Sequence, residues 1–191
     1  ENLVYLWGQE GSGRSHLLQA VCHAWVAEGK RVQYLPLAEL SNYSPEQVLA
    51  GLEYMDLVCI DEISAIADQP EWLDNLLYFV NRSRDGGRCI LITADCPPKQ
   101  LSMDLLDLRS RLTAATTFQL SGYRDIEKIA VLQFRAGSLG LELTDDAAIF
   151  LLNRAPRRLD ELMTKLRELD RSSLVHQRKL SIPFIKQIFD W

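Results

Sequence analysis

The sequence has no long hydrophobic run, and this absence excludes membrane-spanning proteins. No apolar stretch in the 191 residues approaches the roughly 20 that a helix needs to cross a bilayer, and no signal peptide is visible. Apolar residues make up 47% of the chain and charged residues 25%, as in an ordinary folded domain. We therefore expect a cytoplasmic globular protein with no membrane partner.

Cysteine pairs, histidine clusters and excess positive charge are also missing. The four cysteines form no C-x-x-C motif, so buried reduced thiols are favoured over a metal site or a disulfide framework. The formal net charge is −5. A protein that binds DNA broadly through charge needs a concentrated basic face, so this class is disfavoured, and only a local basic patch stays open.

Short apolar runs alternate with helical patterns over the first 122 residues. The predicted strands cover residues 3–7, 31–35, 56–61, 88–93 and 116–120. The predicted helices cover residues 15–28, 45–52, 71–84 and 104–111, with Ser44 as an expected N-cap and Gly29 as a stop. Strands that alternate with helices predict an α/β fold, with a parallel sheet covered on both faces.

Beyond Gly122 the pattern becomes purely helical. Helices are predicted over residues 125–139, from the N-cap Thr144 to about 154, over residues 156–174, and from Ser181 onward. We therefore predict two domains, an α/β domain over residues 1–122 and a small all-helical domain over residues 123–191.

The stretch WGQEGSGRSHLL, residues 7–18, nearly matches the phosphate-loop pattern G-x-x-x-x-G-K-[ST]. It follows an apolar strand and opens a helix, where main-chain N–H groups and a helix N-terminus can hold an anion. A plain strand-to-helix turn is the alternative. The candidate nucleotide-binding residues are Gly8, Gly11, Ser12, Gly13, Arg14, Ser15 and His16, and Ser15 is also a candidate ligand of Mg²⁺.

Arg14 stands where the pattern requires lysine. Lysine carries a compact charge, whereas the guanidinium of arginine is longer, planar and fixed in its donor directions. Arginine still binds phosphate well. The substitution is therefore expected to impair hydrolysis more than binding.

Carboxylates end two of the predicted strands. Asp61 and Glu62 follow four apolar residues, so Asp61 is a candidate Mg²⁺ ligand and Glu62 a candidate base for an attacking water. Asp95 follows the next strand and is a further candidate for contact with that water. The alternatives are carboxylates that merely cap the following segments, or a loop-starting Asp95 before Cys96.

Arg109 and Arg111 lie just before the fifth predicted strand. Solvated arginines near a helix end are the default interpretation. The alternative is an arginine finger that reaches a neighbour's γ-phosphate.

Together these pieces resemble an AAA+ domain, and within AAA+ proteins the DnaA-related family in its Hda branch. The Arg-Ser-His ending of the glycine loop is typical of that branch. The residues that carry the resemblance are 5–7, 11–18, 57–61, 91–93, 97–98, 100–101, 110–112, 169–171 and 178–184. They extend over essentially the whole chain.

The resemblance implies an ADP-binding (or ATP-binding) AAA+ protein with a helical lid over residues 123–191. Hda-like proteins associate with the DNA polymerase III sliding clamp, and so with DNA only indirectly. They stimulate hydrolysis of DnaA-bound ATP and thereby inhibit further initiation of DNA replication. By motif, Arg111 resembles the arginine finger, Asp61 the Walker B aspartate and Asp95 the sensor 1 position. The resemblance thus predicts a regulator rather than an enzyme, and it leaves homo-oligomerisation open.

Three departures from the family pattern leave an alternative function open. The family's clamp-binding motif lies in an N-terminal segment that the 191 residues do not contain. Asp160 occupies the expected sensor 2 position, with Arg157 and Arg158 nearby as candidate substitutes. Glu62 keeps a weak intrinsic ATPase open, so the alternative is a self-contained AAA+ ATPase, similar to a loader or an initiator. A DNA-binding initiator fragment is disfavoured by the acidic net charge.

Overall fold

The computed structural model describes residues 2–176 and 180–191. It divides into two compact units, one that ends at Gly122 and one that covers Tyr123–Trp191. Arg178 and Lys179 of the family motif over residues 178–184 lie outside the described residues.

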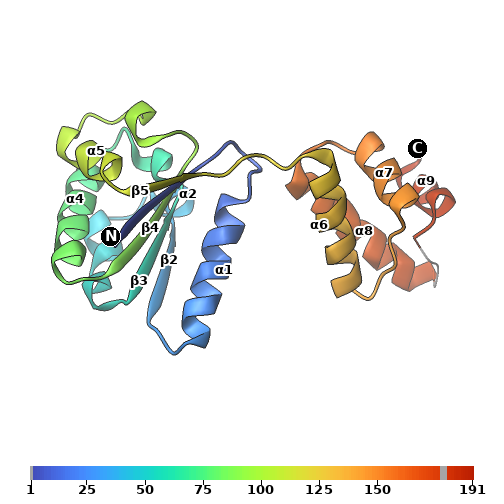
Figure 1. Cartoon of the computed structure of the whole chain (residues 1–191), viewed down its shortest axis with the longest axis horizontal. Coiled ribbons are helices and arrows are strands. Elements are labelled where there is room, and N and C mark those ends of the chain that lie inside the picture. The colour runs from blue at the N-terminus through green and yellow to red at the C-terminus, as the bar shows by residue number, and fades with distance from the viewer. Residues whose placement is uncertain (1, 177–179) are drawn as a thin grey trace. The chain divides into compact units, whose positions relative to one another are not determined.

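The first unit is built on a five-stranded parallel sheet, as predicted (Figure 1). The strands are β1 (Leu3–Trp7), β2 (Val32–Pro36), β3 (Leu57–Asp61), β4 (Cys89–Ala94) and β5 (Thr116–Gln119). Their order in the sheet is β2-β3-β4-β1-β5. Leu3 pairs with Ile90 and Val4 with Thr116, so the starts of β1, β4 and β5 lie together. We call that side of the sheet the amino edge and the side where the strands end the carboxyl edge.

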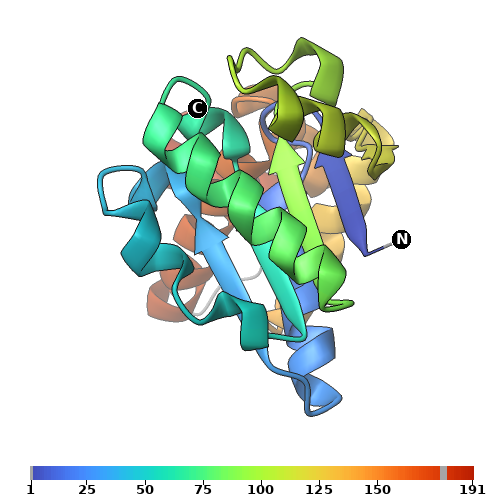
Figure 2. The same ribbon diagram turned by 90° about the vertical axis from the view of Figure 1, so that its left-hand side faces the viewer.

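Helices cover both faces of the sheet. Helix α1 (Arg14–Ala27) packs on one face, and α4 (Pro70–Asp85) and α5 (Leu106–Thr113) pack on the other, where Figure 2 shows α4 in front of the strands. Leu57 and Cys59 of β3 belong to the core beneath α1, whereas Val58 and Ile60 belong to the core beneath α4. Because β3 is buried on both faces, its sequence is apolar up to Asp61.

The short segments of this unit differ from the sequence prediction. The remaining elements are α2 (Leu37–Leu40), α3 (Pro45–Leu49) and the 3₁₀ helices η1 (Leu52–Tyr54), η2 (Ile63–Ile66) and η3 (Pro98–Gln100). The predicted helix over 45–52 ends early because Gly51 turns the chain with φ +76°. Ser44 is the N-cap residue of α3, as predicted, although its side chain makes no capping hydrogen bond. Pro45 at the first helical position presets the backbone, so α3 begins without that side-chain hydrogen bond.

The second unit is all-helical, as predicted. It contains α6 (Asp125–Ser138), α7 (Asp145–Arg154), α8 (Leu159–His176) and α9 (Ile182–Phe189), packed around a leucine-rich core. Thr144 and Ser181 cap α7 and α9 by accepting main-chain hydrogen bonds. The helix predicted from Pro156 begins at Leu159 instead. Within the described residues, no helix combines the length and hydrophobicity of a membrane span.

The four cysteines are unpaired thiols. Cys22 and Cys59 are buried between α1 and the sheet, as expected, and burial raises the pKa of the Cys59 thiol. Cys89 and Cys96 are only half-buried, which corrects the expectation of complete burial. Cys89 begins β4, and Cys96 lies two residues beyond its end.

Candidate functional site

The glycine loop joins the end of β1 to the start of α1 at the carboxyl edge. Gly11 and Gly13 have φ of +78° and +90°, a backbone conformation that favours glycine. Gly8 is required for a different reason. A Cβ there would stand 2.5 Å from the main-chain oxygen of Leu120 and 2.7 Å from the Ser12 hydroxyl. These glycines allow the loop to fold tightly against the sheet.

The start of α1 offers the features of an anion site. No side chain caps the helix, and its first turn has no acidic residue. The first main-chain N–H groups of any helix lack partners within it and carry partial positive charge. The Ser12 hydroxyl is buried without a hydrogen-bond partner. A phosphate group would supply the missing acceptors, so the residues present fit a nucleotide phosphate.

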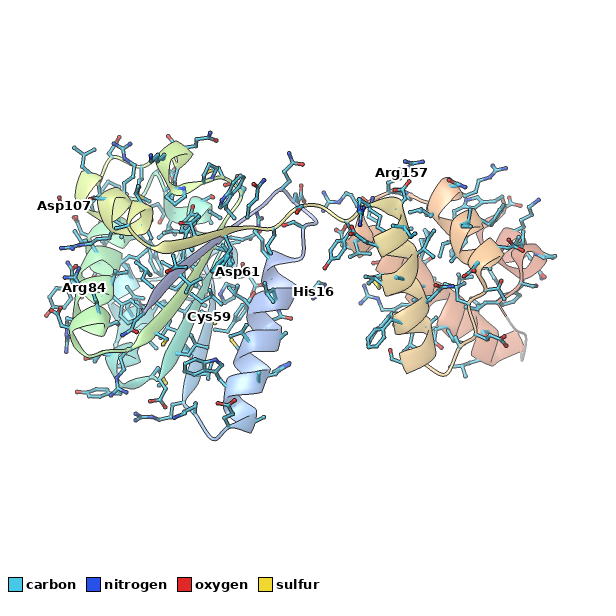
Figure 3. The ribbon with its side chains drawn as sticks, viewed as in Figure 1. His16, Cys59, Asp61, Arg84, Asp107 and Arg157 are labelled. Atoms are coloured by element: carbon cyan, nitrogen blue, oxygen red, sulfur yellow. The ribbon has the colours of Figure 1, made fainter. Side chains whose placement is uncertain are left out.

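Ser15 and His16 occupy the first turn of α1. Ser15 is half-buried, whereas His16 is exposed and lies at the start of the helix in Figure 3. Their main-chain N–H groups belong to the unpartnered set at the helix start. Ser15 therefore lies in the helical turn that borders the proposed phosphate position.

Arg14 is buried and turned into the fold. Its guanidinium donates hydrogen bonds to the main-chain oxygens of Gly8 and Ala94, the latter at 2.9 Å. A guanidinium nitrogen also lies 3.7 Å from a carboxylate oxygen of Glu62. Arg14 thus joins the ends of β1 and β4 to Glu62, and two of its hydrogen-bond donors are occupied by the protein itself.

Asp61 ends β3 and is held by two hydroxyl groups. It accepts hydrogen bonds from Thr93 of β4 and from Tyr34 of β2, the latter at 2.6 Å. Burial, followed by the hydrogen bond to Asp61, raises the pKa of the Tyr34 phenol. Asp61 is itself buried, so this pair of donors fixes its carboxylate.

Thr93 is a site residue that the sequence interpretation missed. Its side chain is fully buried and also accepts a hydrogen bond from the main-chain N–H of Glu62 at 2.9 Å. The side-chain contact from β4 to Asp61 is therefore made by Thr93. A polar residue within the apolar run of β4 was the signal that could have identified it.

Glu62 and Asp95 lie just beyond the strand ends. Glu62 adopts a left-handed backbone with φ +60°, which is uncommon for a residue other than glycine, and 45% of its side chain is exposed. Asp95 is exposed and accepts a hydrogen bond from Ser64, which lowers the pKa of its carboxyl group. These two carboxylates and Asp61 lie at the same carboxyl edge as the glycine loop.

A metal ion at this edge would need ligands from outside the chain. Across the residues that the structure describes, no group of three His, Cys, Asp or Glu side chains could hold a metal ion. Mg²⁺ is usually held by one or two protein oxygens, with water and substrate phosphates completing the octahedron. Ser15 and Asp61 fit that incomplete protein contribution.

Arg111 lies at the opposite edge of the sheet. It is exposed in the last turn of α5 and lines a cavity with Asn2, Leu3 and Ile90, which belong to the starts of β1 and β4. The five residues of β1 separate this edge from the glycine loop. The two edges are about 16 Å apart, at 3.3 Å per strand residue.

The two candidate sensor 2 arginines, Arg157 and Arg158, form ion pairs with neighbouring acids. Arg157 lies 3.3 Å from a carboxylate oxygen of Asp125. Arg158 bonds Asp160 at 2.9 Å, and this contact lowers the pKa of the Asp160 carboxyl group. Figure 3 shows Arg157 on the second unit. These ion pairs lie within that unit.

Each of the two units matches a model of a known protein family. The family model for the bacterial DnaA ATPase domain matches residues 1–119, which is more than half of the chain. The chain belongs to the DnaA-related AAA+ family. A second family model, the lid domain of Hda, matches residues 125–189, so this DnaA-related protein is Hda-like in its helical unit.

Solved structures agree with this DnaA-related AAA+ fold. Domain III of DnaA from Thermotoga maritima has a TM-score of 0.84 at 20% identity over 99% of this chain and 83% of that one. AMPPCP-bound DnaA from Aquifex aeolicus has a TM-score of 0.73 at 18% identity over 86% of this chain and 54% of that one. The RuvB branch migration motor of Thermotoga maritima has a TM-score of 0.75 at 16% identity over 99% and 61%. The chain thus spans little more than half of the two longer proteins.

Proposed function

We propose that this chain is a nucleotide-binding regulator of DnaA that inhibits initiation of DNA replication. It holds ADP in the loop over residues 8–16 and presents Arg111 to ATP bound by DnaA. Arg111 acts in trans as an arginine finger and speeds hydrolysis of that ATP. The match to an Hda lid over residues 125–189 supports the regulatory role.

The observation that carries the proposal is the placement of Arg111 and the glycine loop at opposite edges of one sheet. Parallel pairing puts the start of β5, just after Arg111, beside the start of β1, whereas the loop follows the end of β1. An ion pair requires contact within a few ångströms, far less than the roughly 16 Å length of β1. This separation supports a role for Arg111 toward a nucleotide held by another molecule rather than toward the chain's own loop.

Arg111 is chemically free for this role. It is exposed, and among the described residues it makes no ion pair. A guanidinium that approaches a transferring phosphoryl group neutralises the charge on its equatorial oxygens, and a finger of this kind contributes about 10³–10⁵ in rate.

The chain's own loop fits retention of a nucleotide. The N–H groups at the start of α1 would hold the phosphates, and Ser15 and Asp61 would hold Mg²⁺, which would screen the phosphate charge. Arg14 binds main-chain oxygens and lies beside Glu62, the residue that would otherwise accept a proton from water. This arrangement favours binding over turnover. Aquifex DnaA, which shares the fold, is itself described as AMPPCP-bound.

The proposal includes the sliding clamp as a second partner. DnaA inactivation would then be confined to the period after the clamp is loaded on DNA, and this chain would reach DNA only through the clamp. The family resemblance supports the clamp as a partner, since Hda-like proteins associate with the clamp.

Stimulation of DnaA by purified variants tests the proposal. Arg111→Ala is expected to abolish stimulation of DnaA's ATPase and to leave the affinity of this chain for ADP within twofold. Arg109→Ala is a matched control, because Arg109 lies on the same helix and does not line the cavity of Arg111. Full stimulation by Arg111→Ala would refute the proposed role.

The second candidate function is a self-contained AAA+ ATPase in DNA replication. The specific observation in its favour is Glu62, a half-exposed carboxylate at the carboxyl edge beside Asp61. Single-turnover hydrolysis by the isolated chain separates the two functions. Fast hydrolysis that is lost in Glu62→Gln would support the ATPase, whereas slow hydrolysis unchanged by Glu62→Gln would support the regulator.

A further inference from the structure

The cavity beside Arg111 contains two more arginines. Its volume is about 450 Å³, and Arg84 and Arg88 line it together with Arg111. Arg84 lies in the last turn of α4, Arg88 precedes β4 and Arg111 lies in the last turn of α5, so three separate segments each place an arginine on the cavity lining. No carboxylate lines the cavity among the described residues. In a chain of net charge −5, this is a local concentration of positive charge.

The three arginines differ in how far their charge is already neutralised. Arg88 bonds a carboxylate oxygen of Asp56 at 3.1 Å, so its charge is paired. Arg84 lies 3.8 Å from Asp85, and the two side chains are 53% and 75% exposed. An exposed pair at such a distance is weak and exchanges readily with solvent. Arg84 and Arg111 therefore keep most of their charge available to a ligand.

The apolar part of the cavity lining strengthens the attraction between these arginines and an anion. Leu3, Val80, Ile90 and the two alanines at positions 114 and 115 form the apolar part of its lining. Electrostatic attraction is stronger beside apolar walls than in open water. Figure 3 shows Arg84 on α4, away from His16 and the start of α1, so the cluster is separate from the chain's own glycine loop.

We infer that Arg84 is a second cation that meets the partner's nucleotide together with Arg111. The ligand of the cavity is the polyphosphate of an ATP bound to the partner, which is the anion that Arg111 serves in the proposed function, and the inference rests on that function. A triphosphate has several charged oxygens in a row, so it can engage two guanidinium groups at once, and arginine matches phosphate geometry with paired donors. Arg88, which is paired with Asp56, forms part of the cavity lining.

Two kinetic quantities test this inference. Hydrolysis of DnaA-bound ATP is measured at increasing concentrations of this chain, for the wild type and each variant. The two quantities are the maximal rate and the chain concentration that gives half of that rate. Arg84→Ala is expected to lower the maximal rate about tenfold, with the half-maximal concentration changed less than twofold, because a contact to the transferring group acts mainly in the transition state. Arg84→Lys should recover part of the rate by restoring the charge.

Arg82→Ala is the matched control. Arg82 lies two residues earlier on the same helix, bonds Glu53 at 3.0 Å, stacks over Tyr78 and does not line this cavity. Its removal is expected to leave both kinetic quantities unchanged. Circular dichroism and urea unfolding of all variants establish that each is folded.

Three results would overturn the inference. An Arg84→Ala rate equal to wild type would show that Arg111 acts alone. A raised half-maximal concentration with an unchanged maximal rate would assign Arg84 to an acidic surface of the partner. Salt-sensitive binding of single-stranded DNA that is lost in Arg84→Ala would assign the cavity to a nucleic-acid backbone. If Arg111→Ala itself had no effect, the proposed function would fail instead, so the two failures are distinguishable.

Discussion

Replacing Thr93 with valine tests how the carboxyl edge holds its acidic residues. Valine has nearly the same shape as threonine, so the packing of this fully buried position is kept. The change removes the hydrogen bond that Thr93 donates to Asp61 and the one that it accepts from the main-chain N–H of Glu62. Asp61 keeps the hydrogen bond from Tyr34 at 2.6 Å. The perturbation therefore isolates two hydrogen bonds.

The expected loss is large for a single substitution. A hydrogen bond to a charged group contributes about 1.5–3 kcal/mol and a neutral one about 0.5–1.5 kcal/mol, so Thr93→Val should lower the free energy of unfolding by roughly 2–4 kcal/mol. For a protein of this size, that loss corresponds to a fall in Tm of roughly 5–15 °C.

Urea unfolding followed by circular dichroism measures this loss. Thr117→Val is a matched control, because Thr117 is an exposed residue of β5 whose hydroxyl bonds only the nearby oxygen of Ala115. The control should change the free energy of unfolding by less than about 0.5 kcal/mol. Equal stabilities of Thr93→Val and Thr117→Val would refute the assignment of Thr93 as the residue that fixes Asp61.

Three further predictions concern the same edge. Gly8→Ala places a Cβ 2.5 Å from a main-chain oxygen, so we expect at least a tenfold loss of ADP affinity, measured by calorimetry, and unaltered affinity would contradict the tight loop. Arg14→Lys shortens the group that pairs with Glu62, so intrinsic ATP hydrolysis should rise in single-turnover assays and should fall again in the double variant with Glu62→Gln. The hydrogen bond from Ser64 lowers the pKa of Asp95 from its ordinary value of 3.8, so its stabilising effect is present above that pH and is lost as the pH falls through the lowered pKa. Asp95→Asn should therefore reduce stability at pH 6 more than at pH 2, and an equal effect at both would argue against the pairing.

Local sequence patterns were sufficient to predict the five strands, the longer helices and the sheet type, but not α2 or the short 3₁₀ helices. An apolar run such as 57–60 indicates a strand that is buried on both faces, and Gly29 and Gly51 mark points where a helix ends. The strand order could not be predicted from these patterns, because it depends on pairings between distant segments. Residues of β1 pair with those of β4 more than eighty positions later.

The candidate site shows the same division between local and long-range information. The loop pattern placed Gly8, Gly13 and Ser15 correctly at a strand-to-helix junction. The pattern could not predict that Arg14 would turn inward, since the carbonyl of Ala94 that receives it is eighty residues away. The cluster of Arg84 with Arg111 had no sequence signal either, because it arises only where the ends of α4 and α5 meet the amino edge of the sheet.

The central claim is that Arg111 acts on a nucleotide held by another molecule. DnaA is loaded with ATP labelled on the γ-phosphate, this protein is loaded with ADP, and release of labelled phosphate is followed in a single turnover. Because the ADP carries no γ-phosphate, all of the labelled phosphate that is released comes from the DnaA-bound ATP. We predict fast release with the wild-type protein and release slower by about 10³ with Arg111→Ala. Equal rates for the two proteins would contradict the account.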